Sequence, residues 1–177
     1  MSTLQDYLIQ KRQAVRENDE YLLSDAYDPV RLSVSTTAEG RSGIRRHRVR
    51  DFQLITDSAP ALAGYSLGPT EPELLLSAIS GCLTHSFLVT AARQEVILDS
   101  LLVEVMGVAD ARGTLPGHED TNRYPQQIAY VARVGSPASA EEVRALFDAV
   151  DATCPILCFF RKGHPVEGSL IHAGWEC

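Results

Sequence analysis

The stretch GPTEPELLLSAISGCL, residues 68–83, opens an almost wholly apolar segment of the chain. From Glu73 to about Arg93 nearly every residue is apolar or small, and Glu73 falls in the first turn, where a carboxylate favours the positive end of the helix dipole. The segment is close to the length of a membrane span, but hydroxyl side chains and one histidine are scattered along it and no second such segment exists. We therefore expect a central helix buried within protein rather than a transmembrane helix.

Segments with strand-like patterns flank this helix on both sides. Two or three antiparallel strands are predicted before it and a strand pair after it, followed by a second helix and a last strand. This order predicts an α+β domain with antiparallel sheet packed on the long buried helix, and no glycine-rich phosphate fingerprint points to a doubly wound fold. The predicted strands are 30–37, 44–56, 101–110, 126–134 and 165–172, and the second helix covers 136–150.

The composition and net charge of the chain indicate which kinds of binding partner it can have. The chain has 177 residues, 45% of them hydrophobic and 22% charged, so it can bury one sizeable core. The net charge of −7 argues against binding to nucleic acid or to an anionic membrane surface. The N-terminus is charged throughout and lacks the apolar region of a secretory signal, so we expect a cytoplasmic protein. Cysteines kept reduced there are better explained as catalytic, redox-active, metal-bound or buried thiols than as a disulfide framework.

Two of the four cysteines have surroundings that suggest a role. Cys154 precedes Pro155, and a helix that begins at this proline would direct free N–H groups toward the sulfur and lower its pKa. A cysteine that merely caps the helix is an equally good interpretation. Cys82 follows Gly81 in the apolar helix, where a free cysteine is usually a small core residue unless a cation lies near its sulfur. Cys177 is most simply an exposed, non-essential thiol.

A cation could come from an arginine-rich hairpin between the first predicted strands. For most of its arginines a solvated face is the better interpretation, and without interleaved aromatic residues the hairpin is a poor nucleic-acid site. A zinc site is the other alternative, but the spacings differ from the paired cysteines of structural zinc sites. The hairpin residues are Arg41, Arg45, Arg46, His47, Arg48 and Arg50, and the metal candidates are Cys154, Cys158, His164 and His172, or Cys82 with His85.

Three motifs together resemble the OsmC/Ohr family of thiol-dependent peroxidases. They are GPTEPELLLSAISGCLTH (68–85), VDATCPILCFF (150–160) and the turn EGRSG (39–43). The order of elements agrees over about residues 30–172, which divides the chain into an N-terminal helical extension, 1–29, and an OsmC-like domain, 30–177. The resemblance implies an intertwined homodimer with the long helix at its centre and active sites at the subunit interface. Ile156, Leu157 and Cys158 depart from the valine and histidine that often follow Cys-Pro in the family, which indicates a divergent branch.

The resemblance also implies a role for each site residue. Cys82 would be the peroxidatic thiolate and Cys154 the resolving thiol, while Arg41 with Glu73 would keep Cys82 ionised and orient the peroxide. Such a protein reduces organic hydroperoxides in defence against oxidative stress, needs no cofactor or metal, and is recycled by an external dithiol. The rival interpretation is a non-enzymatic member that binds an apolar small molecule at the dimer interface.

Helix geometry limits what Glu73 can do. Glu73 and Cys82 are nine residues apart, so on one regular helix they point to opposite sides and are separated by about 13 Å along the axis. Either Glu73 precedes a turn that is not helical, or it serves the site of the other subunit, or it only favours the helix dipole. The sequence also leaves open which arginine faces the sulfur.

Overall fold

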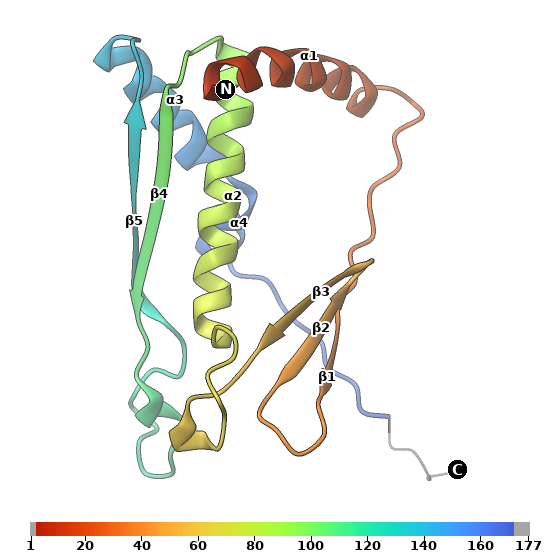
Figure 1. Cartoon of the computed structure of the whole chain (residues 1–177), viewed down its shortest axis with the longest axis vertical. Coiled ribbons are helices and arrows are strands. Elements are labelled where there is room, and N and C mark those ends of the chain that lie inside the picture. The colour runs from red at the N-terminus through yellow and green to blue at the C-terminus, as the bar shows by residue number, and fades with distance from the viewer. Residues whose placement is uncertain (1–2, 172–177) are drawn as a thin grey trace.

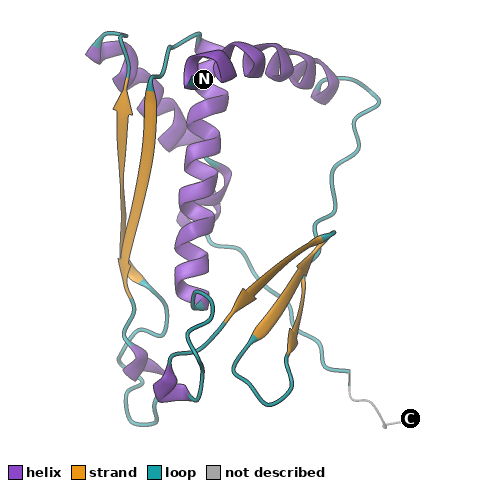
Figure 2. Ribbon diagram, viewed as in Figure 1, coloured by secondary structure: helices purple, strands orange, loops and turns teal. Residues whose placement is uncertain are grey.

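The computed structural model describes residues 3–171, which form an α+β fold with two antiparallel sheets (Figures 1 and 2). The first sheet has three strands in the order β1-β2-β3, and the second is the hairpin β4-β5. In chain order the elements are α1 (Leu4–Leu22), β1 (Ser35–Ala38), β2 (Arg45–Val49), β3 (Phe52–Thr56), η1 (Pro60–Leu62), α2 (Glu71–Gln94), β4 (Ser100–Val108), η2 (Ala111–Thr114), β5 (Gln126–Gly135), α3 (Ala140–Thr153) and α4 (Pro155–Lys162).

The long helix α2 begins two residues before the predicted start. The backbone N–H and the hydroxyl of Thr70 both donate to Glu73 Oε2, at 2.7 and 2.8 Å, so Glu73 caps the helix from inside its first turn. Pro72 fits this turn because its missing N–H has no partner there in any helix. At the other end Glu95 adopts a left-handed conformation with φ of 60°, which stops the helix.

One side of α2 forms the core of the fold. The β4-β5 hairpin, α3 and α4 pack on this side, and α1 crosses near the C-terminal end of α2 (Figure 1). Ser80 anchors the helix to the hairpin, because its hydroxyl donates to the Val103 carbonyl at 3.0 Å. The buried core residues are Leu8, Ile79, Leu83, Phe87, Ala91, Leu98, Val103, Leu146, Val150, Cys154 and Leu157.

The other side of α2 is open in the single chain, so the helix would be surrounded by protein only in an assembly of chains, and that part of the expectation stays a prediction. Ala78, Gly81 and His85, which follow one another at helical spacing, are exposed. By length and composition alone α2 could cross a membrane. In this structure it packs against β4, α3 and α4.

The three-stranded sheet lies apart from this core (Figure 1). Its strands pair with register Thr36 to His47 and His47 to Leu54, yet Phe52 and Leu54 are exposed, so the sheet buries little apolar surface within one chain. The predicted first strand is shorter than expected. Residues 30–34 are not in a strand because no neighbouring strand pairs with them.

The predicted last strand is not formed. Residues 165–171 have no strand pairing, and His172 lies outside the described residues. Val166, Leu170 and Ile171 are about nine-tenths exposed, at 88%, 90% and 93%. An alternating pattern becomes a strand only when a second strand accepts its hydrogen bonds, and one chain offers this segment none.

The helix α1 packs on α2 through Leu8 and Val15, its two buried residues. Arg93 of α2 donates to both carboxylate oxygens of Asp19 on α1. The N-terminal extension is therefore attached to the central helix, and the division of the chain at residue 29 stays a prediction.

Removing the Leu83 side chain is expected to destabilise the fold strongly. Leu83 is fully buried on α2, so Leu83→Ala should lower the free energy of unfolding by about 2–5 kcal/mol. Urea unfolding at one fixed protein concentration measures this change. The control is Leu62→Ala in η1, where the side chain is exposed and the expected loss is below about 0.5 kcal/mol. Equal losses in the two variants would contradict the assignment of the core.

Candidate active site

Two thiols from distant parts of the chain meet at the centre of the fold. Cys82 lies in the middle of α2, and Cys154 lies at the junction between α3 and α4. The Cys154 thiol faces the Cys82 sulfur with 3.5 Å between the two Sγ atoms. Cys154 is fully buried and Cys82 is half-buried. The structure therefore brings together the two cysteines that the sequence singles out, at a distance from which a small movement would allow a disulfide to form.

The N-terminus of α4, which follows Cys154, affects the sulfur of Cys82 and not that of Cys154. Cys154 caps α4 with its backbone, but its side chain accepts no capping hydrogen bond, contrary to the sequence expectation. The backbone N–H of Ile156, in the first turn of α4, instead acts on the Cys82 thiol and lowers its pKa, and the Ser86 hydroxyl acts in the same direction. The partial positive charge of a helix N-terminus is thus directed at Cys82.

The single chain alone does not make Cys82 a low-pKa thiol. Burial raises the pKa of the Cys82 thiol, and the nearby Cys154 thiol raises it further, while the hydrogen bonds from Ile156 and Ser86 oppose the shift without reversing it. Because the thiolate is the nucleophilic form, a reactive Cys82 needs an additional positive charge close to its sulfur.

The structure does not bring Arg41 and Glu73 together. Arg41 lies exposed in the hairpin turn and makes no side-chain hydrogen bond or ion pair with residues 3–171, and Glu73 is occupied by Thr70. Within one chain Glu73 takes the helix-terminal role, and its service to the site of another subunit stays a prediction. The sequence carries no signal that separates Glu73 from Glu71, since both acids fall in the first turn of α2.

A different arginine and glutamate form the ion pair near this helix start. Arg45 of β2 binds the Glu71 carboxylate with two nitrogens, Nε to Oε1 at 2.5 Å and Nη2 to Oε2 at 3.2 Å. Arg45 Nη1 also donates to the Gly43 carbonyl at 2.7 Å and to the Ser58 hydroxyl at 3.0 Å. The guanidinium is held in one orientation, as a bidentate pair with further hydrogen bonds requires.

The loop before α2 is organised by a buried carboxylate that the sequence analysis missed. Asp57 accepts backbone N–H groups from Ser58, Tyr65 and Leu67 at 2.7, 2.9 and 3.1 Å. These hydrogen bonds, that from Leu67 first, lower the pKa of Asp57 although burial opposes the shift. The loop therefore stays folded against the hairpin and places Ser58 beside Arg45. An aspartate at the end of a strand, before a loop rich in proline and glycine, is the signal that could have identified it.

Within one chain the ion pair and the thiols are far apart. Glu71 and Cys82 are eleven residues apart on α2, which corresponds to about 16 Å along the helix axis. The Arg45 guanidinium, bound to Glu71, thus lies near one end of α2 while the sulfur atoms lie near its middle. A cation from this pair can reach a thiol only if it belongs to another copy of the chain.

The metal alternative finds no support in residues 3–171, where no group of three histidine, cysteine or acidic side chains is arranged to hold a metal ion. The thiol of Cys158 donates to the Ala152 carbonyl at 3.5 Å, and the ring of His164 stacks on Phe159. His172 and Cys177 lie outside the described residues.

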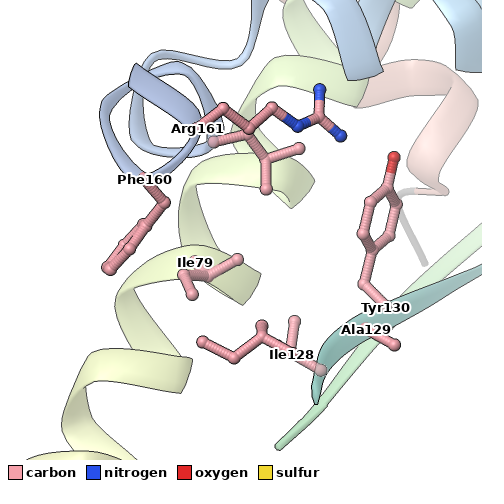
Figure 3. Close-up of a pocket in the computed structure, with 8 residues that line it drawn as sticks. Ile79, Ile128, Ala129, Tyr130, Phe160 and Arg161 are labelled. Carbon is pink, nitrogen blue, oxygen red and sulfur yellow. The ribbon is translucent and has the colours of Figure 1, made fainter. Parts of the chain in front are cut away.

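An apolar cavity of about 400 Å³ is lined by residues of α2, the β4-β5 hairpin and α4 (Figure 3). Ile79, one helical turn before Cys82, and Leu157, one turn after Cys154, both line it. Figure 3 shows the Arg161 guanidinium and the Tyr130 hydroxyl at one end, with isoleucine side chains at the other. The remaining lining residues are Val105, Ile128, Ala129 and Phe160.

The polar groups at one end of this cavity form hydrogen bonds and an ion pair with a carboxylate of the protein. Tyr130 donates to Asp151 Oδ1 at 2.7 Å, and Arg161 Nη2 contacts the same oxygen at 2.8 Å. Burial and the neighbouring carboxylate raise the pKa of Tyr130, so the phenol stays protonated. The cavity thus has apolar walls and one polar, neutralised end, a composition that suits a mainly apolar small molecule.

Comparisons with known proteins agree on one family. Residues 64–168, more than half of the chain, match the model of the family described as OsmC-like protein. An OsmC-like protein from Mycoplasma pneumoniae superposes with a TM-score of 0.64 at 20% identity, covering 76% of this chain and 90% of that one. A protein from Legionella pneumophila, described as an organic hydroperoxide resistance protein OsmC, superposes with a TM-score of 0.54 at 14% identity, covering 77% and 93%. No match was found among curated proteins.

Proposed function

The chain belongs to the OsmC-like protein family, and on that premise we propose that it is a thiol-dependent peroxidase that reduces organic hydroperoxides in defence against oxidative stress. The observation that carries the proposal is the 3.5 Å contact between the Cys82 and Cys154 sulfurs. The name of the Legionella pneumophila protein, an organic hydroperoxide resistance protein, supports the same activity. We place this activity in the cytoplasm.

The proposed reaction has two steps and uses only the two thiols. The Cys82 thiolate attacks the hydroxyl oxygen of the hydroperoxide, the O–O bond breaks, and the alkoxide takes up a proton and leaves as an alcohol. Cys82 is then a sulfenic acid. The Cys154 sulfur attacks it, an S–S bond forms, and hydroxide leaves with a proton as water. An external dithiol returns two electrons and restores both thiols. The apolar cavity, which is lined by residues one helical turn from each cysteine, favours an alkyl hydroperoxide over hydrogen peroxide.

A second copy of the chain would complete the site. Three features support an intertwined homodimer: the three-stranded sheet has no core of its own, one side of α2 is open, and residues 165–171 have no strand to pair with. In such a dimer the Arg45–Glu71 pair of one copy would lie near Cys82 of the other and lower the pKa of its thiol. This replaces Arg41 and Glu73 as the polar pair that the resemblance implies.

Oxidation by one equivalent of cumene hydroperoxide tests the proposal directly. We expect the reduced protein to form a Cys82–Cys154 disulfide, which mass spectrometry and peptide mapping identify, because the two sulfurs already face one another. In Cys154→Ser the reaction should stop after the gain of one oxygen atom at Cys82. If all thiols stay reduced while a control thiol peroxidase reacts, the proposed activity is wrong.

The second candidate function is that of a binding protein without enzymatic activity. The cavity in Figure 3 supports it, since it has apolar walls and could hold a small molecule whether or not the thiols react. The pKa of Cys82 discriminates between the two functions in the intact assembly, because a packing cysteine titrates at or above the ordinary value and a peroxidatic cysteine well below it.

A further inference from the structure

His47 of β2 is connected to the Arg45–Glu71 pair by hydrogen bonds, although neither the fold nor the proposed reaction requires a histidine there. Its ring bridges two threonines, with Nδ1 at 2.8 Å from the Thr36 hydroxyl and Nε2 at 2.9 Å from the Thr56 hydroxyl. Thr56 is fully buried at the end of β3. Its hydroxyl reaches the Glu71 carboxylate, so a chain of hydrogen bonds joins the imidazole to the ion pair.

The Thr56 hydroxyl has one proton and can accept two. Its oxygen lies 2.8 Å from Glu71 Oε1 and 3.2 Å from Arg45 Nε, in addition to its contact with His47. Burial by itself would raise the pKa of Glu71, but hydrogen bonds from Thr56, from the Glu71 backbone and from Arg45 outweigh it, so the pKa is lowered and the carboxylate is ionised. An ionised carboxylate only accepts, so the single hydroxyl proton of Thr56 must point to Glu71.

This assignment determines the proton on the imidazole. Because the Thr56 proton goes to Glu71, the Thr56 oxygen can only accept from its other neighbours. Nε2 of His47 must therefore carry a hydrogen. In the neutral ring, Nδ1 then accepts from the Thr36 hydroxyl, and in the imidazolium it donates to that hydroxyl. Both states keep the Nε2–H donor toward Thr56.

We propose that His47 is a positioning residue that acts on the Glu71 carboxylate through the Thr56 hydroxyl. The carboxylate in turn holds Arg45, so the inference rests on the proposed function, in which Arg45 of one copy faces Cys82 of the other. His47 and Arg45 donate to the Thr56 oxygen, and the Thr56 hydroxyl donates its proton to Glu71. The hydroxyl therefore holds one carboxylate oxygen of Glu71 in place, and the Arg45 guanidinium bound to that oxygen keeps a single orientation.

Other charges near His47 do not compete for this role. Arg46 and Arg48, its neighbours on β2, point to the opposite face of the sheet, as alternate residues of a strand do. Arg46 is paired with Glu39 at 2.5 Å. The residues opposite His47 in the adjacent strands are Thr36 and Leu54, neither of them charged. The charges that face the imidazole are thus those of the Arg45–Glu71 pair.

Nuclear magnetic resonance of the ring nitrogens tests the chain of hydrogen bonds without any peroxide. At mildly alkaline pH we expect His47 in the full-length protein to show a slowly exchanging Nε2–H proton. Thr56→Ser keeps the hydroxyl and should keep this signal, whereas Thr56→Val should lose it. A neutral His47 ring protonated on Nδ1, or an Nε2 proton that exchanges equally fast in the parent and in Thr56→Val, would overturn the inference.

Kinetics test the positioning role. His47→Leu is expected to lower kcat/KM for cumene hydroperoxide about five- to tenfold and to raise the pKa of Cys82, as the loss of one hydrogen bond in the network would do. His47→Gln, whose amide can donate from a similar position, should recover most of this loss. Arg48→Gln removes a charge from the same strand and is the control, expected to match the parent. A parent rate in His47→Leu would overturn the positioning role, whereas absence of peroxidase activity in the parent would reject the proposed function and leave the resonance result standing.

Discussion

Replacement of Cys82 by serine is expected to lower the rate of hydroperoxide reduction at least about a thousandfold, because the hydroxyl of serine is far less nucleophilic than a thiolate. Consumption of cumene hydroperoxide in the presence of an excess of dithiol measures this rate. The side chains differ by a single atom, so the folded structure should be preserved. The circular dichroism of the variant would verify this.

The other two described cysteines serve as controls for Cys82. Cys158→Ser should keep the parent rate, since the Cys158 thiol donates to the Ala152 carbonyl at the end of α3 and has no part in the contact between the Cys82 and Cys154 sulfurs. Cys154→Ser should keep the first oxidation of Cys82 but lose turnover with the dithiol. If Cys82→Ser reduced the hydroperoxide as fast as the parent, Cys82 would not be the nucleophile, and the contact between the sulfurs would be one of packing only.

Replacement of Arg45 by methionine is expected to lower kcat/KM about a hundredfold and to raise the pKa of Cys82, because burial then acts on the thiol without an opposing cation. Methionine keeps much of the length and apolar volume of the arginine. The pH dependence of Cys82 alkylation by iodoacetamide gives the pKa, and initial rates give kcat/KM.

The pair implied by the family resemblance provides matched controls for Arg45. Arg41→Met removes an exposed hairpin arginine and should stay within about twofold of the parent, since surface substitutions have small effects. Glu73→Gln can still cap α2 and should behave in the same way. Glu71→Gln should resemble Arg45→Met. A large loss in Arg41→Met together with a parent rate in Arg45→Met would reverse the assignment made from the structure.

Mixed dimers show whether Arg45 acts on Cys82 of the other copy or on Cys82 of its own chain. Refolding equal amounts of Cys82→Ser and Arg45→Met together should restore about a quarter of the parent activity, because half of the dimers are mixed and each has one complete site. If Arg45 served the thiol of its own chain, no complete site would form and the mixture would stay inactive. Sedimentation of the parent protein establishes whether the dimer exists at the concentrations used.

The secondary structure of the core was predictable because its signals are local. Ser139 and Glu142 form the hydrogen-bonded start of α3, and Pro155 begins α4, as the residue types on either side of each helix start indicate. The apolar segment after residue 70 is a helix, since no strand pattern competes with it. The order of these elements and the three motifs are sufficient to identify the family.

Choices between residues of the same kind were not predictable. Both Glu71 and Glu73 suit the first turn of α2, and only the position of Thr70 relative to the helix axis assigns Glu73 to capping and leaves Glu71 to Arg45. Several hairpin arginines compete for one ion pair, and strand register selects Arg45, which lies directly opposite Thr56. Such selections depend on distances between segments that are remote in sequence.

The sequence by itself therefore determined the helices, most strands and the family, and it singled out the two cysteines that lie together in the structure, because these features depend on residue type, local periodicity and motif order. The tertiary structure decided which thiol the N-terminus of α4 acts on, which arginine binds which glutamate, and that residues 165–171 remain unpaired in one chain. The physical reason is that hydrogen bonds and ion pairs act over about 3 Å, so they are determined only when packing has placed the two partners side by side.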